Sequence, residues 1–207
     1  AASTSRPSMH DSNQMNMLLG QGGVEGSGPV LRTTAHAEAP GQCVKCHMPD
    51  ARHSFTVSYD KGCAPCHTAA DAAARAATVK SEILNGLLAL KTRMEGWATA
   101  HYGNDLFWEY TSNITAEGFT APAQSGVPIQ IKRARHNYYF IVRSSDYGVH
   151  NAAYCRHLLT VANENLDAIG AARPAASRGK VSNDVILAMI KKDMDRVHRA
   201  ELNDIEQ

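Results

Sequence analysis

Aromatic residues and net charge are both scarce in this chain of 207 residues. Aromatic side chains make up only 6% of the sequence although 43% of it is hydrophobic, which is thin for a protein core of this length. The formal net charge is +1, so the chain has no broad basic field and we expect no nucleic-acid partner. The length allows one large or two small domains.

Long apolar runs are absent as well. No stretch reaches the roughly 18 consecutive apolar residues that a membrane-spanning helix needs, so we expect no transmembrane segment. The first residues, Ala1 to Thr4, lack the charged and apolar regions of a signal peptide. We therefore expect residue 1 to follow a cleavage site or to lie within a longer precursor.

Cysteine occurs only five times, and four of the five form two copies of one pattern. The copies run from Cys43 to His47 and from Cys63 to His67, and each reads Cys-x-x-Cys-His. This is the attachment signature of c-type haem, in which two thiols bind the vinyl groups and the next imidazole binds the iron. Two covalently attached haems would also supply apolar surface to an aromatic-poor chain. The predicted cofactor ligands are Cys43, Cys46, Cys63 and Cys66 for attachment, and His47 and His67 as proximal iron ligands.

Two Cys-x-x-Cys pairs also fit a four-cysteine zinc site, and such a pair can be a redox dithiol. Four thiolates satisfy zinc without a histidine directly after each pair, and this chain holds ten histidines. We therefore favour haem and keep zinc as the alternative. Because covalent haem attachment takes place outside the cytoplasm, haem implies a periplasmic or extracellular location at the cell surface.

The distribution of apolar residues predicts a mostly α fold, in which a haem-packed loop segment precedes long helices and there is little or no β-sheet. Residues 1–42, rich in Gly, Ser and Pro, predict extended loop with one short helix near Gln14 to Leu19. Residues 43–67 predict a compact loop that carries both haem motifs. Helices are expected at about 69–100, 129–147 and 151–170, and after Ser182. One face of the first long helix is apolar, with Val79, Ile83, Leu87, Leu90, Met94 and Trp97.

We accordingly divide the chain into three parts. Residues 1–68 form a loop-rich haem-binding segment, and residues 69–170 form a helical part that packs on the haems. Residues 181–207 form a C-terminal helix whose apolar stripe has no obvious partner in the chain, so we predict an oligomer contact there. That stripe consists of Leu187, Ile190, Met194 and Val197.

Each haem iron has a second axial position, and the side chain that fills it sets its chemistry. A histidine gives a low-potential electron carrier, whereas an open position permits catalysis. His36 lies shortly before the first motif, and His150 follows a glycine at a corner between two predicted helices. His53 comes only six residues after His47, so we assign it to a different haem. His10, in the N-terminal segment, is the fourth candidate.

The order of these motifs resembles a known family. The segments from Gln42 to Phe55, from Cys63 through the long helix, and from Asp146 to Asn151 are similar to the C-terminal part of multihaem cytochromes. Their relatives include the ammonia-forming cytochrome c nitrite reductases. The likeness extends upstream through Met9-His10-Asp11 and His36. It implies that His36, His53 and His150 supply distal haem ligands. It also implies that His10 is a distal ligand or lies beside an active-site haem.

The chain also departs from that family. The reductases carry a catalytic haem whose proximal ligand is the lysine of a Cys-x-x-Cys-Lys motif, which is missing here. We therefore expect no nitrite reduction by this chain alone and predict no catalytic residue. Two haems need two distal histidines but four candidates exist, so we infer that a surplus pair such as His10 and His53 binds haems of another chain.

These observations favour an electron-transfer protein that passes single electrons through bis-histidine haems to haems on partner chains. The partners would be other multihaem cytochromes or copies of itself. The alternative is an electron-transfer subunit, or a fragment, of a nitrite- or hydroxylamine-type reductase whose catalytic haem lies on another chain. Cys155, the odd cysteine, lies in a predicted helix without a second cysteine nearby, and we predict a buried structural thiol.

Overall fold

The computed structural model describes residues 12–30, 32, 34–51, 53, 55–64, 66–109, 122–174 and 181–205. These residues form eight α-helices and two 3-10 helices, and none of them lies in a β-strand. The predicted mostly α fold is confirmed. In chain order the helices are α1 (Gln14–Leu18), α2 (Ala35–Glu38), α3 (Gln42–His47), α4 (Tyr59–Gly62), α5 (Ala69–Tyr102), η1 (Asp105–Glu109), η2 (Gln124–Gly126), α6 (Ile129–Ser144), α7 (Ala152–Asp167) and α8 (Asn183–Ile205).

The long helices lie close to their predicted positions, whereas the motif segment contains more helix than expected. The sequence predicts a loop over residues 43–67, but α3 covers the whole first motif and α4 ends directly before Cys63. Gly41, at φ 78°, occupies the left-handed region just before α3. Across the described part of the chain, no helix combines the length and the apolar character that crossing a membrane requires.

Helix α5 is the longest element, and its ends follow from its sequence. Thr68 caps the N-terminus, where its hydroxyl oxygen accepts a hydrogen bond from the Asp71 backbone N–H at 3.2 Å. Gly103 ends the helix at φ 72°, and its N–H donates to the Thr99 carbonyl at 2.9 Å. The predicted apolar face is confirmed, since Val79 packs against the core and the other five residues are buried in it.

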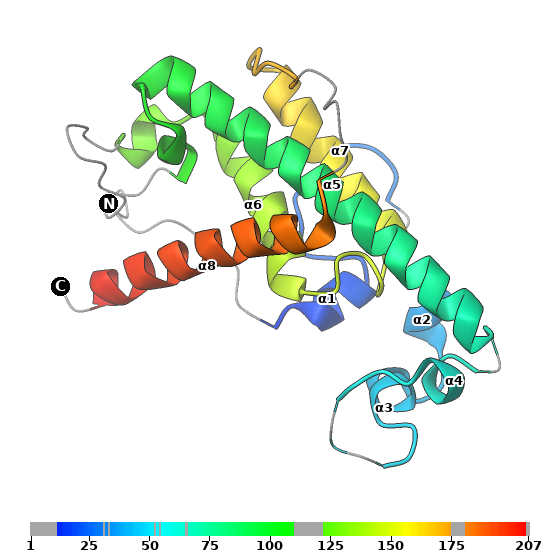
Figure 1. Ribbon diagram of the computed structural model, residues 1–207. Helices are drawn as coiled ribbons and strands as arrows, with labels where there is room; N and C mark the ends of the chain where they lie inside the picture. The colour runs from blue at the N-terminus through cyan, green and yellow to red at the C-terminus, as the bar shows by residue number, and fades with distance from the viewer. Residues whose placement is uncertain are drawn as a thin grey trace.

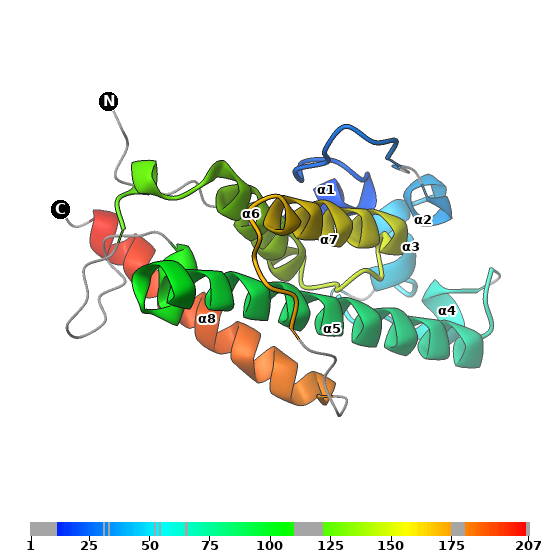
Figure 2. The same ribbon diagram turned by 90° about the horizontal axis from the view of Figure 1, so that it is seen from above.

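The long helices form a layered arrangement around α5. Figure 2 shows α6 and α7 along one side of α5 and α8 along the other. The short helices α2, α3 and α4 gather near the N-terminal end of α5, away from the η1 end (Figure 1). Residues 35–67, which hold α2 to α4 and both motifs, are called the ligand segment below.

The apolar core belongs to the long helices, and the ligand segment contributes almost nothing to it. Trp108, Tyr138, Phe140 and Tyr154 are fully buried between η1, α6 and α7. Within the described residues of the ligand segment, only Ala37 and Gly62 are buried. This segment therefore lacks a core built from its own side chains.

Helix α8 uses its apolar stripe inside the chain. Ile190 and Val197 are buried in the core, and Leu187 and Met194 pack against it. The premise that this stripe has no partner within the chain is therefore wrong, because the stripe packs on the core that the other long helices form. The oligomer contact predicted for residues 181–207 stays a prediction, and on α8 the side chain of Val185 is exposed.

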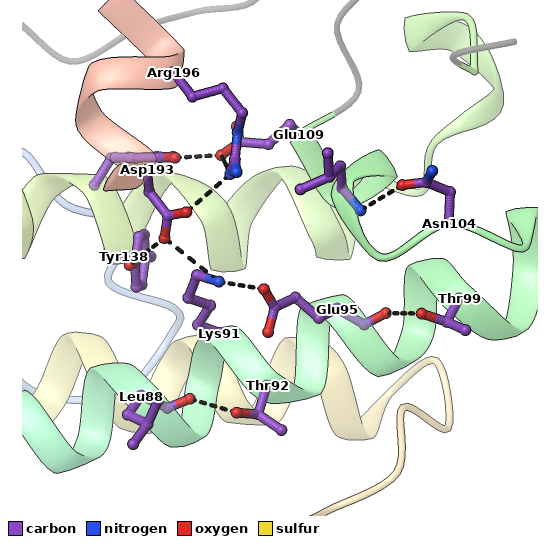
Figure 3. A network of polar contacts seen from close by, with 12 residues as sticks. Leu88, Lys91, Thr92, Glu95, Thr99, Asn104, Glu109, Tyr138, Asp193 and Arg196 are labelled. Carbon is purple, nitrogen blue, oxygen red and sulfur yellow. Dashed lines mark hydrogen bonds and ion pairs between the residues drawn. The ribbon is translucent and has the colours of Figure 1, made fainter. Parts of the chain in front are cut away.

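A cluster of charged side chains anchors α8 to the helices beneath it (Figure 3). Asp193 Oδ2 on α8 lies 3.5 Å from Lys91 Nζ, and Asp193 Oδ1 lies 3.0 Å from the guanidinium of Arg196. Lys91 also pairs with Glu95, and Arg196 lies 3.7 Å from Glu109. The cluster is mostly buried, so each charge depends on its partners.

Candidate functional site

The four histidines of the site come together as two pairs. The ring centroids of His47 and His150 lie 6.1 Å apart, and those of His36 and His67 lie 6.5 Å apart. Each pair joins one histidine that directly follows a Cys-x-x-Cys motif to one predicted distal candidate. His150 reaches its partner from the loop before α7, whereas the other three lie in the ligand segment.

The spacing within each pair suits two ligands of one metal ion. An imidazole nitrogen binds a metal at about 2.0 Å and lies about 1.1 Å from its ring centre, so two opposed imidazoles have centres about 6.2 Å apart. Both observed separations are close to this value. Parallel-stacked rings would lie closer together, whereas ring centroids in ordinary edge-to-face contact lie about 4.5–7 Å apart, a range that includes both pairs. The geometry therefore fits one iron between the members of each pair.

Hydrogen bonds at Nδ1 orient both histidines of the motifs. His47 Nδ1 donates to the Phe55 backbone carbonyl at 3.0 Å, and His67 Nδ1 lies 3.1 Å from Asp71 Oδ2. A partner on Nδ1 keeps the proton there and leaves the Nε2 lone pair for a metal. Both rings are thus held in the tautomer that an axial ligand needs.

Asp146 builds the loop that presents His150. Its carboxylate accepts hydrogen bonds from the Ser144 hydroxyl at 2.8 Å, the Gly148 N–H at 3.1 Å and the His150 N–H at 3.2 Å. His150 Nδ1 lies 2.7 Å from Asp146 Oδ2, as an ion-pair contact rather than an aligned hydrogen bond. One carboxylate therefore fixes both the backbone and the ring of His150.

Gly148 lets this loop press against α5. It lies at φ +92°, and a Cβ there would come within 2.9 Å of both Val79 and Ile83. A side chain would be strained by the backbone conformation and would also push the loop away from α5. The position of His150 is therefore set by the core.

His36 is held through the short helix that carries it. Gln42 Nε2, on α3, donates to the Ala37 carbonyl at 3.1 Å, which links α2 to the helix of the first motif. Ala37 is buried, whereas the His36 side chain is exposed. This contact places His36 beside His67 across the ligand segment.

None of the four motif cysteines is joined in a disulfide. Cys43 and Cys66 are exposed, and Cys46 and Cys63 are partly buried. Burial raises the pKa of the Cys46 and Cys63 thiols above the ordinary cysteine value. Among the residues that the structure describes, no three Cys, His, Asp or Glu side chains converge as a metal site would require.

The two motifs approach each other through their backbones. A Cβ on Gly62 would lie 2.6 Å from the Cys46 carbonyl oxygen and 3.2 Å from Cys46 Cα. Such distances exclude any side chain, so only glycine permits this packing of α4 on α3. The second motif starts at the next residue, and the two Cys-x-x-Cys-His motifs are therefore close neighbours.

Several apolar side chains of the ligand segment and of the loop that carries His150 are exposed. Val44 is 57% exposed and Phe55 66% exposed, and Val57, Tyr59 and Val149 are exposed as well. Large apolar side chains are usually buried on folding, because removing apolar surface from water is favourable by about 25 cal/mol per Å². Porphyrin discs bound at the two motifs would offer apolar surface to exposed side chains of this kind, which is a second respect in which the residues fit haem.

The remaining candidates lie elsewhere. His53 is exposed in the loop between α3 and α4 and is not brought into either pair. His10 lies outside the described residues, so its predicted role as a ligand stays a prediction. Cys155 is fully buried, as predicted, and its thiol donates to the Met17 sulfur at 3.4 Å.

Sequence reasoning misses the residues that orient the ligands. The sequence marks Asp71 only as an acidic residue in the first turn of a helix, although it also contacts His67. The i, i+4 spacing of His67 and Asp71, and of Asp146 and His150, is a usable signal once helix or turn geometry is assumed. The Phe55 carbonyl and Gly62 leave no comparable pattern in the sequence.

Comparisons with protein-family models, with curated proteins and with solved structures found no match to this chain.

Proposed function

We propose that this chain is a dihaem c-type cytochrome that transfers single electrons. The observation that carries the proposal is the pairing of each motif histidine with a second histidine, at 6.1 Å for His47 with His150 and at 6.5 Å for His67 with His36. Two such pairs beside two Cys-x-x-Cys motifs match two six-coordinate haems in number, residue type and spacing.

The residues divide the work of binding between them. The thiols of Cys43, Cys46, Cys63 and Cys66 would attach the porphyrins, and the four paired imidazoles would bind the two irons. When bound, each haem supplies a one-electron couple between ferric and ferrous iron. Hydrogen bonds at Nδ1 fix the rings of His47 and His67, and the second histidine of each pair would close the iron against exchangeable ligands, which favours electron transfer over catalysis.

The proposal extends to partners and location. Attached haem places the protein in the periplasm or at the cell surface, and partner haems belong to other multihaem cytochrome chains or to further copies. His53 is exposed and outside both pairs, which is compatible with a ligand offered to a partner's haem. That role stays separate from the dihaem assignment and is tested separately below.

The visible spectrum of the purified holoprotein, with and without carbon monoxide, tests the assignment. We expect reduced c-type bands from two haems per chain that carbon monoxide leaves unchanged. His150→Ala and His36→Ala should each open one iron and allow carbon monoxide to bind to half of the haem. His198→Ala is the matched control, because His198 is an exposed histidine of α8 outside both pairs.

Two results would count against the proposal. The first is a protein that contains zinc and shows no c-type bands after expression in a host that attaches haem. This result would favour the four-cysteine zinc site. Carbon monoxide binding to the unsubstituted protein would mean an open iron and would favour the reductase-type alternative.

A further inference from the structure

Two of the four paired histidines contact a carboxylate through Nδ1, one in each pair. Asp146 Oδ2 lies 2.7 Å from His150 Nδ1, and Asp71 Oδ2 lies 3.1 Å from His67 Nδ1. A carboxylate on Nδ1 makes the imidazole a more basic ligand, and its negative charge favours the more positive, oxidised iron. Each contact therefore lowers the reduction potential of the iron that its histidine binds.

Asp146 acts on His150 through its charge rather than through an aligned hydrogen bond, and that charge is only weakly screened. Its side chain is only 6% exposed, and apart from His150 its hydrogen-bond donors are the neutral groups of Ser144 and Gly148. Among the described residues, no lysine or arginine forms an ion pair with it. A buried charge without a counter-charge is weakly screened, so its field reaches the neighbouring ligand.

Asp71 differs from Asp146 both in its exposure to solvent and in having a positively charged partner. Its side chain is 43% exposed, and Arg75 Nε lies 2.9 Å from Asp71 Oδ1 and 2.8 Å from Oδ2. The guanidinium opposes the charge of the carboxylate, and water screens what remains. The His67 ring therefore feels a much weaker negative field than the His150 ring.

Resting on the proposed dihaem function, we propose that Asp146 and Arg75 set unequal potentials at the two irons. The iron of His47 and His150 has the lower potential, and the iron of His36 and His67 has the higher. Haems held by these residues would pass one electron from the first pair, which would be oxidised, to the second pair, which would be reduced, with no bond or proton changed. The chain thereby gains a direction, accepting electrons at the first pair and releasing them at the second.

A potentiometric titration of the holoprotein, followed by its visible spectrum, tests this order. Arg75→Gln should lower the higher potential, with about a tenfold change in the reduction equilibrium, or about 59 mV for one electron. Asp146→Asn should raise the lower potential by a similar factor. Both variants should reduce the difference between the two reduction potentials, Arg75→Gln by lowering the higher potential and Asp146→Asn by raising the lower one. His36→Met identifies the second iron, because an axial methionine raises the potential.

The Arg75→Gln variant should fold normally, so its result does not depend on whether Asp146→Asn folds. The Arg75 side chain is 68% exposed, so Arg75→Gln is tolerated even where Asp146→Asn loosens the loop of His150. Arg156→Gln is the matched control, because it removes an exposed guanidinium that pairs with Glu82 at 2.6 Å and contacts no paired histidine. We expect neither potential to move in this control.

The possible failures are distinguishable. Two haems of equal potential, the reverse order, or an unchanged titration in Arg75→Gln would overturn the inference and leave the dihaem assignment intact. Absence of c-type bands would overturn both.

Discussion

The backbone contact between the two motifs can be tested with one methyl group. In Gly62→Ala the new Cβ would lie 2.6 Å from the Cys46 carbonyl oxygen. The carbonyl belongs to the backbone, so no side-chain rotation relieves the clash, and α4 must move away from α3. The change therefore separates the two attachment sites without touching any cysteine or histidine.

The expected cost follows from the geometry. Inserting a methyl group into a closed contact costs about 1–3 kcal/mol. Because the ligand segment has almost no core of its own, this cost should appear as local opening. At a factor of ten per 1.4 kcal/mol, amide hydrogen exchange in α3 and α4 should become about 5- to 150-fold faster. The amides of α6 and α7 should keep their exchange rates.

Two other glycines provide matched controls in the same chain. A Cβ at Gly96, inside α5, would meet no neighbouring group within 4 Å, so Gly96→Ala should stabilise the helix by about 0.5–1 kcal/mol. At Gly86 the nearest atom, at 2.7 Å, is the end of the flexible Leu159 side chain, so that substitution should be tolerated better than Gly62→Ala. If Gly62→Ala left exchange in α3 and α4 unchanged, the inferred contact between the motifs would be wrong.

Three further predictions concern the charged cluster and the exposed histidine. Glu109→Gln removes the carboxylate that Arg135 Nε contacts at 2.8 Å in a buried pair; thermal unfolding should report a loss of about 3–5 kcal/mol, and an unchanged midpoint would refute the pairing. Burial raises the pKa of Asp193, so its contribution to folding is present at acid pH and lost as the pH rises above the ordinary value of 3.8. The difference in unfolding free energy between Asp193→Asn and the unsubstituted protein should therefore shift in favour of the variant between pH 3.8 and neutral pH. Denaturant titrations in which this difference shifts toward the unsubstituted protein would contradict the prediction. His53→Ala should leave the chain's own spectrum unchanged but alter that of a partner cytochrome in the complex; an unaltered partner spectrum would remove His53 as a ligand between chains.

The features that are predictable from the sequence are those encoded by neighbouring residues. The Cys-x-x-Cys-His spacing is local, and so is the helical stripe of α5, which lies where its period predicts. The helix stop at Gly103 is local as well. The predicted stop of the next helix at Gly148 is wrong, because α6 ends at Ser144 and Ser145, at φ 58°, is its C-cap. Each of these patterns needs only backbone geometry to be interpreted.

The features that sequence reasoning misses depend on segments far apart in the chain. The packing of α8 requires knowing that Lys91 on α5 meets Asp193, which lies three helices later in the chain. The choice of His150 as the partner of His47 has the same origin. Four distal candidates stay open in the sequence because ligand pairing is a tertiary contact, which residue spacing does not determine.

The origin of the four ligands also separates the roles of the two pairs. His36, His47 and His67 all belong to the ligand segment, which buries almost no side chains of its own. Only His150 comes from the helical core, where Asp146 and Gly148 hold it against α5. An iron between His47 and His150 would therefore join the segment to the core, whereas an iron between His36 and His67 would join the segment only to itself. It follows that losing His150 should weaken both a haem ligand and the attachment of the whole segment, while losing His36 should affect one haem alone.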